Sequence, residues 1–208
     1  EQIGSKTGTF GIPEMGTNFV RQMLLDAQPK NFSELVRISG FSHGTDVWLN
    51  NAQDLIKNGV VKLEDAISTR DDVMNYLIQH GVKPLTSFKV MENVRTGKGL
   101  EKGGSNNRAE LDAAHVPQWF IDSCLKIGYL FPRAHAVAYV MMAFRIAWFK
   151  VHQPLAFYAA YFYRRSQKGG FDEGMMCHGI ELVKKKLQEI KADEDSTAKD
   201  DDLFTTLE

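Results

Sequence analysis

The sequence predicts a mainly α-helical protein, folded as a compact array of several helices with at most a short strand near the C-terminus. Apolar residues recur at helical spacing, as at 17–27, where Phe19, Val20, Met23 and Leu24 form one stripe. Residues that favour helix N-termini precede such segments, and glycine or proline follows them. No heptad pattern persists and the connections are short, which favours a compact array over a coiled coil.

The first half of the chain is expected to hold helices at 17–27, 31–39, 45–59, 70–81 and 84–99. The side chain of Ser33 can cap the second of these, and Thr45 or Asp46 can cap the third. Gly59 and Gly81 suit the C-terminal ends of the third and fourth, because glycine readily adopts the left-handed conformation there.

The second half opens with a polar stretch at 99–115, which predicts an exposed loop with a candidate helical turn at 108–113. Further helices are expected at 117–129, 131–150, 154–166 and 172–192. The residues expected to hold 131–150 in the core are Val140, Phe144 and Trp148. The apolar face of the last helix is formed by Ile180, Val183, Leu187 and Ile190.

The C-terminal segment is strongly acidic. KADEDSTAKDDD, at 191–202, is interpreted as a solvated linker, and DLFTTLE, at 202–208, is the best candidate for a short strand. We therefore expect a helical domain at 1–190, followed at 191–208 by an acidic linker and the start of a connection to another domain.

Composition limits the classes of protein to which the chain can belong. Its 208 residues are 43% hydrophobic, enough for an ordinary core, and its net charge of −1 lacks the basic excess of a free-standing nucleic-acid binder. Arg145 and Lys150 interrupt the most apolar stretch, and the first residues lack the apolar core of a signal peptide, so a cytoplasmic protein is expected. Cys124 and Cys177 lie far apart, which argues against a disulfide framework or a zinc site.

Polar side chains begin the apolar segment FPRAHAVAYVMMAFRIAWFK, at 131–150. Pro132 suits the first position of a helix, so Arg133 and His135 fall in a first turn whose unpaired N–H groups favour an anion such as phosphate. Tyr139 lies on the same face as His135, where its ring could stack on a base or sugar. Histidine and tyrosine on an apolar helix are more often core residues, and spacing alone does not decide between the two interpretations.

A second group of polar residues lies between two glycines. RISGFSHGTDVW, at 37–48, contains Ser39, His43 and Asp46. These residues do not predict a nucleophilic triad, because neighbours in sequence rarely meet in that geometry, and capping explains Ser and Asp before a helix. They remain candidates for the lining of a ligand pocket.

Basic residues occur at two further places. Arg70 directly precedes Asp71 and Asp72, so it is expected to pair with a carboxylate unless an anionic ligand engages it. Arg95 and Lys98 lie in a loop of the type that touches nucleic-acid backbones, although such loops are usually only solvated. The sequence has no P-loop, no H-E-x-x-H motif and no metal-binding trio of carboxylates.

Four blocks carry a family resemblance: GIPEMGTNFVRQML, FSELVRISGFSHGTDVWLNNAQDLI, RDDVMNYLI and WFIDSCLKIGYLFPRAHAVAYVMMAFRIAWFKVHQPLAFYAAYF. They closely resemble consecutive blocks in the fingers region of the PolC-type DNA polymerase III alpha subunit, the replicative polymerase of low-GC Gram-positive bacteria. The likeness covers nearly the whole chain, although the stretch around 100–116 departs from the family pattern. FPRAHAVAY is similar to the fingers signature of C-family replicases more generally.

The resemblance implies a domain that binds the incoming dNTP and the nascent base pair during template-directed DNA synthesis. Arg133 and His135 match the basic residue and the histidine of the family block, and Arg70 is a further candidate for the triphosphate. Phe131 and Ser39 match positions near the site of base-analogue inhibitors.

The resemblance also implies which parts lie elsewhere. Palm aspartates hold the catalytic Mg²⁺ ions of such a polymerase, so no catalytic or metal-binding residue is expected here, and the piece should be inactive alone. The implied partners are primer–template DNA, dNTP, the rest of the polymerase chain, and the replisome with its sliding clamp through other regions; no membrane is implied. The alternative is a non-catalytic helical interaction module whose buried histidine and tyrosine satisfy each other.

Overall fold

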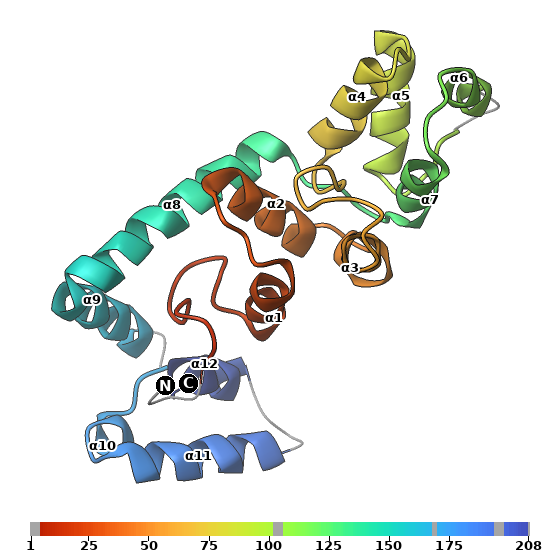
Figure 1. The fold of residues 1–208 in the computed structure, drawn as a ribbon. Coiled ribbons are helices and arrows are strands. Elements are labelled where there is room, and N and C mark those ends of the chain that lie inside the picture. Colours follow the sequence, from red (N-terminus) through yellow and green to blue (C-terminus); the bar gives the residue numbers. More distant parts are fainter. Residues whose placement is uncertain (1–4, 102–105, 168–169, 194–197, 208) are drawn as a thin grey trace. The chain divides into compact units, whose positions relative to one another are not determined.

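The computed structural model describes residues 5–101, 106–167, 170–193 and 198–207, with no side chains described at 198–202. Its helices, in chain order, are α1 (Asn18–Ala27), α2 (Phe32–His43), the π-helical turn η1 (Trp48–Ala52), α3 (Gln53–Lys57), α4 (Arg70–Gln79), α5 (Pro84–Val94), α6 (Asn107–Ala113), α7 (Gln118–Lys126), α8 (Arg133–His152), α9 (Pro154–Ser166), α10 (Glu173–Met176), α11 (Ile180–Ala192) and α12 (Ala198–Leu207) (Figure 1). The described residues contain no strand, only two isolated β-bridges. The predicted mainly α-helical fold is confirmed.

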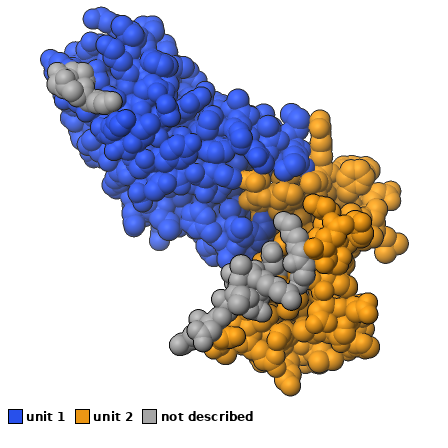
Figure 2. Space-filling view, turned by 180° about the vertical axis from the view of Figure 1, so that it is seen from behind, with its two compact units in different colours: residues 1–8, 16–142 blue, residues 9–15, 143–208 orange. Residues whose placement is uncertain are grey.

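The chain divides into two compact units (Figure 2). The first is made of Glu1–Gly8 and Gly16–Met142, and the second of Thr9–Met15 and Ala143–Glu208. The division falls inside α8. This division by packing does not test the predicted domain boundary at residue 190, which stays a prediction.

Side-chain caps set the starts of the first helices. The hydroxyl of Thr17 accepts a hydrogen bond from the N–H of Val20 at the start of α1. At α2 the cap is Asn31, whose side chain accepts from the N–H of Glu34. The prediction that Ser33 caps this helix is therefore wrong, because Ser33 already lies inside its first turn.

The expected continuous helix at 45–59 is also wrong. Three residues of η1 leave helical geometry, including Asn50 with φ 57°. The cause is a buried pairing: Asn51 Nδ2 donates to the carbonyl oxygens of Asp46 and Ser123, and Ser123 Oγ donates to Asn51 Oδ1 at 2.7 Å. Thr45 pairs with Tyr129 in a β-bridge, so neither Thr45 nor Asp46 caps a helix here.

The C-terminal predictions need two further corrections. The helix expected at 172–192 is interrupted at Gly179, whose φ of 108° suits glycine, and it forms α10 and α11 instead. The segment proposed as a strand is helical as part of α12, where Thr206 and Leu207 are buried. Of the predicted acidic linker, 194–197 lie outside the described residues and 198–202 are helical.

The core of the first unit comes from helices far apart in sequence. Its largest fully buried side chains include Met23, Ile38, Phe41, Leu77, Leu111 and Phe120. Helices α4 and α5 form a closely packed pair (Figure 1). Removing these apolar side chains from water supplies the main free energy that holds the helices together.

Helix α8 is less buried than its sequence predicts. Val140 is buried as expected, but Phe144 and Trp148 are 59% and 51% exposed, so they do not hold the helix in the core. Small residues at 136 and 143 are buried beside Val140 instead. By length and hydropathy α8 could cross a membrane, but a single helix of this kind is weak evidence for a membrane protein.

Candidate nucleotide-binding site

The connection between α7 and α8, at 127–132, is the centre of the candidate site in the first unit. The N–H of Thr45 donates to the carbonyl oxygen of Tyr129 at 3.0 Å. The next two residues make similar bonds: Leu130 N–H donates to Arg95 O at 3.2 Å, and Arg70 N–H donates to Phe131 O at 3.1 Å. One short segment therefore joins the loop after α2, the start of α4 and the end of α5 to the first turn of α8.

Two carboxylates of α4 meet the first residue of α8. Asp71 Oδ2 accepts a hydrogen bond from the main-chain N–H of Arg133 at 2.8 Å. Asp72 Oδ1 lies 3.8 Å from Arg133 Nη1, and Asp72 Oδ2 lies 3.4 Å from Nη1 of Arg37. The start of α8 thus faces the carboxylate of Asp71, whereas the sequence analysis predicts an anionic ligand such as phosphate at this helix end.

Asp72 is held firmly in this arrangement. Its Oδ2 accepts hydrogen bonds from the main-chain N–H groups and the hydroxyls of Ser68 and Thr69, which completes a capping box at the start of α4. Its side chain is only 11% exposed. Both oxygens of Asp72 are therefore engaged by groups of the protein.

Four rings follow one another along this site. His43 stacks on Phe131 at 4.8 Å between centroids, Phe131 meets His135 edge to face at 4.8 Å, and His135 lies 4.6 Å from Tyr139. His135 and Tyr139 do share a face, as their spacing predicts. Both are exposed, Tyr139 by 37%, so the alternative in which they are buried partners is wrong.

Ser39, His43 and Asp46, the residues predicted to line a pocket, differ in how they relate to the site. His43 joins the site through Phe131, and its Nδ1 lies 2.8 Å from Ser39 O. Ser39 is buried at 1% exposure, and its Oγ has no hydrogen-bond partner among the described residues. Asp46 adopts a left-handed φ of 57°, with its carboxylate close to Gly128.

Arg95 and Lys98 lie at the C-terminal end of α5, near Arg70. Arg95 donates to Glu92 through two nitrogens, Nε to Oε1 at 2.7 Å and Nη2 to Oε2 at 2.8 Å. The hydrogen bond from Arg95 lowers the pKa of Glu92, and the positive charges of Arg95, Arg70 and Lys98 lower this pKa further. The predicted DNA-contacting cations therefore share an electrostatic environment with Arg70.

The sequence analysis missed several residues that organise this site. Asp71, Asp72 and Glu92 were given no role in the site, yet the first two contact Arg133 and the third contacts Arg95. Arg37, also given no role, contacts Asp72. Two local signals were available: Asp72 stands three residues after Thr69, as a capping box requires, and Glu92 stands three residues before Arg95. No local signal pairs Arg133 with Asp71 and Asp72, which precede it by 62 and 61 residues.

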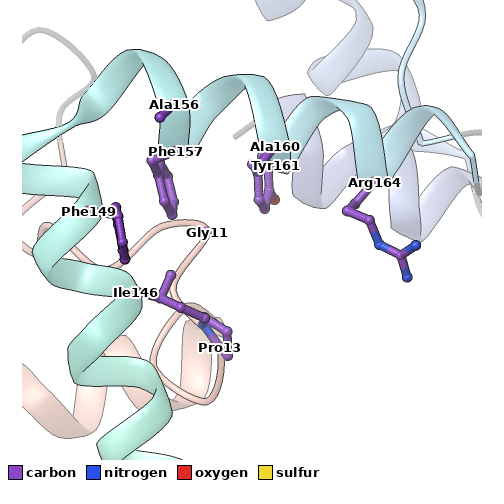
Figure 3. A pocket seen from close by; sticks show the side chains of 9 residues that line it. All are labelled: Gly11, Pro13, Ile146, Phe149, Ala156, Phe157, Ala160, Tyr161 and Arg164. Carbon is purple, nitrogen blue, oxygen red and sulfur yellow. The ribbon is translucent and has the colours of Figure 1, made fainter.

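The second unit holds a separate pocket of about 470 Å³. Figure 3 shows its lining, in which Phe157 and Tyr161 of α9 stand near the loop that carries Gly11 and Pro13. Lys150 Nζ donates to the carbonyl oxygen of Phe10 in the same loop at 2.6 Å. The lining is almost wholly apolar and contains none of the predicted site residues.

Within the described residues, no three side chains of histidine, cysteine, aspartate or glutamate form a group that could hold a metal ion. The candidate site combines Arg70, Arg95 and Arg133 with the rings of His43, Phe131, His135 and Tyr139, and with carboxylates that contact two of these arginines. Arginine side chains can bind phosphate groups through charge and hydrogen bonds, and aromatic rings can stack on a base.

Comparison with known proteins identifies the family. Residues 2–114 match the family model of the bacterial DNA polymerase III alpha subunit finger domain. The chain is 57% identical to the PolC-type DNA polymerase III of Thermotoga petrophila over 92% of its length, and 54% identical to that of Bacillus subtilis over its full length. It is 53% identical to the corresponding protein of Caldanaerobacter subterraneus, again over its full length.

The chain covers about 14% of the length of the Thermotoga petrophila and Bacillus subtilis relatives and about 15% of that from Caldanaerobacter subterraneus. The family model ends before α8, but the relatives align through it. This chain belongs to the PolC-type DNA polymerase III family, and its sequence corresponds to the finger domain of that polymerase.

Proposed function

We propose that the site at the start of α8 binds the triphosphate of an incoming dNTP and one face of the nascent base pair in a replicative DNA-directed DNA polymerase. The observation that carries this proposal is the hydrogen bond between Arg70 N–H and Phe131 O, which brings Arg70 close to the first turn of α8. Two arginines thereby flank one exposed helix end. Fixed cations are a feature that phosphate recognition uses.

Arg133 and Arg70 bind phosphate oxygens in this proposal, and His135 adds a further donor. Phe131 and Tyr139 supply ring faces for the base or sugar, with Ser39, His43 and Asp46 behind them as a candidate pocket lining. The Arg133 side chain is 43% exposed, which leaves its guanidinium accessible to a ligand. Arg133 Nη1 lies 3.8 Å from Asp72 Oδ1, which is a long ion pair. Because a guanidinium has five N–H donors, this pair leaves donors for a ligand.

The chemical step is assigned to other parts of the polymerase. The palm carboxylates and the Mg²⁺ ions that they hold are expected outside this chain, so this piece positions the nucleotide and is inactive alone. Arg95 and Lys98 are proposed to contact a phosphate backbone. The proposed partners are primer–template DNA, dNTP, the remaining polymerase chain and the replisome with its sliding clamp, in the cytoplasm.

The test is steady-state nucleotide incorporation by a full-length PolC-type polymerase that carries this sequence. We expect Arg133→Ala, His135→Ala and Arg70→Ala each to raise the nucleotide KM or lower kcat, with thermal unfolding close to that of the unmodified enzyme. Arg108→Ala is the control, because Arg108 pairs with Asp112 on an exposed face of α6. Normal incorporation by the three variants, or losses that follow only from unfolding, would contradict the proposal.

A further inference from the structure

Glu92 is a carboxylate that is influenced by three cations, Arg70, Arg95 and Lys98. The sequence analysis assigns Arg70 to the triphosphate, and Arg95 and Lys98 to a nucleic-acid backbone. Arg95 and Arg70 both bind the 127–132 segment through their main chains: Leu130 N–H donates to Arg95 O, and Arg70 N–H donates to Phe131 O. Consecutive Cα atoms are only about 3.8 Å apart. The end of α5 and the start of α4 therefore border the same two residues of this segment.

Lys98 is carried to the same place by a tight turn. Gly97 has φ 69°, and a Cβ atom there would lie 2.7 Å from the carbonyl oxygen of Gly128, so the turn fits closely against the 127–132 segment. The main-chain N–H of Lys98 donates to Asn93 O at 3.0 Å, which closes the turn back onto α5. This part of the predicted loop is an ordered helix ending.

Glu92 is the counter-ion of this group. Its two carboxylate oxygens accept both hydrogen bonds of the Arg95 fork, at 2.7 and 2.8 Å. The pKa of Glu92 is lowered chiefly by that hydrogen bond, and then by the charges of Arg95, Arg70 and Lys98. Arg95 is thus paired with Glu92 at a partly exposed surface, and the positive charges of Arg70 and Lys98 act on the same carboxylate.

We propose that Arg70, Arg95 and Lys98 form one phosphate-binding cluster, in which Glu92 is an internal anion that a ligand phosphate displaces from Arg95. A guanidinium binds a carboxylate and a phosphate through the same pair of donors, so the two compete for Arg95. Glu92 also repels an approaching phosphate. It therefore weakens phosphate binding at this cluster and keeps Arg95 extended until a ligand arrives.

The inference rests on the proposed function, because it assumes that this surface of the polymerase receives a phosphorylated ligand. The phosphate can come from the nucleoside triphosphate or from a DNA strand, which present the same oxygen chemistry. Two measurements distinguish these sources: the KM for nucleotide, and the Kd for primer–template DNA at several salt concentrations.

The experiment uses the full-length polymerase with Glu92→Gln, which keeps the size of the side chain and removes its charge. Asp112→Asn is the matched control, since Asp112 pairs with Arg108 in an exposed pair of similar spacing on α6. Because Glu92 and Arg95 are 34% and 31% exposed, loss of their pair should not threaten folding. Arg95→Ala is the second variant, in which the cation itself is lost.

We expect Glu92→Gln to strengthen phosphate binding about threefold to tenfold, the effect of removing one nearby negative charge. A lower nucleotide KM would assign the phosphate to the triphosphate, and a lower Kd with steeper salt dependence would assign it to DNA. Arg95→Ala should shift the same measurement in the opposite direction. A structural defect would not produce tighter binding.

If Glu92→Gln changes neither measurement more than Asp112→Asn does, the inference is overturned. Arg133→Ala, measured in parallel, decides the proposed function separately. A raised KM in Arg133→Ala beside an unchanged Glu92→Gln enzyme would retain the nucleotide site and reject the role of Glu92 alone.

Discussion

The main-chain N–H of Arg70 donates a hydrogen bond to the carbonyl oxygen of Phe131, with 3.1 Å between nitrogen and oxygen. A parallel bridge between Thr69 and Phe131 accompanies it. The first turn of α4 and the segment that leads into α8 are therefore joined through backbone groups, whose geometry does not depend on side-chain rotamers. Long, flexible arginine side chains can then begin from fixed positions on both sides of a ligand.

Tyr139 provides a test of the aromatic part of the site. In the full-length polymerase, Tyr139→Ala should raise the nucleotide KM about tenfold, since stacking on an aromatic ring contributes about 1–3 kcal/mol per base. Tyr139→Phe keeps the ring and should remain within about twofold of the unmodified enzyme. Equal KM values for Tyr139→Ala and Tyr139→Phe would mean that the ring does not contact the nucleotide.

Much of the helical architecture could be predicted from local sequence. The helix that begins at Arg70 can be predicted from three local signals: Thr69 before it, acidic residues in its first turn and Gly81 after it. The break at 48–52 could not be predicted, because its cause is a hydrogen bond from Asn51 to Ser123, 72 residues away. Local propensity gives no information about a partner at that distance.

The candidate site was predictable to a similar extent. The first-turn placement of Arg133 and the shared face of His135 and Tyr139 follow from helical periodicity and from Pro132. The carboxylates that hold Arg133 come from α4, and their role depends on the tertiary arrangement of the 127–132 segment. The exposure of Trp148 contradicts its apolar character, and periodicity could not predict that side of α8 to be open.

Asp72 should stabilise the fold more than any exposed ion pair of the first unit. Asp72→Asn removes the charge that caps α4 and leaves Arg37, only 14% exposed, without its carboxylate at 3.4 Å. We expect the free energy of unfolding to fall by about 2–4 kcal/mol. Thermal or denaturant unfolding measures this change, and Asp112→Asn, from an exposed pair, should change it by less than about 1 kcal/mol.

For Ser39 we expect the opposite effect on the free energy of unfolding. Its Oγ is buried and has no hydrogen-bond partner among the described residues, so Ser39→Ala removes a desolvated polar group from helix α2. The free energy of unfolding should stay the same or rise by about 1 kcal/mol. Ser123→Ala is the matched control: its buried Oγ donates to Asn51, and its loss should destabilise by about 1–3 kcal/mol. A large loss of stability in Ser39→Ala would reveal a partner for this hydroxyl.

Gly97 tests how closely the end of α5 fits the segment that enters α8. In Gly97→Ala the new Cβ would lie 2.7 Å from the carbonyl oxygen of Gly128, a backbone atom that cannot rotate away, and the φ of 69° is unfavourable for alanine. Gly59 has a similar φ of 68°, but a Cβ there meets nothing within 4 Å. Gly59→Ala should therefore lower the free energy of unfolding by about 1 kcal/mol, the conformational part alone, whereas Gly97→Ala should lower it by about 2–4 kcal/mol.

Gly97→Ala should also affect ligand binding, because the displaced turn carries Lys98 and follows Arg95. The Gly97→Ala polymerase should bind its phosphorylated ligand more weakly, while Gly59→Ala should bind it normally. Equal stability and equal ligand binding in the two variants would show that this close contact does not hold the cationic cluster in place.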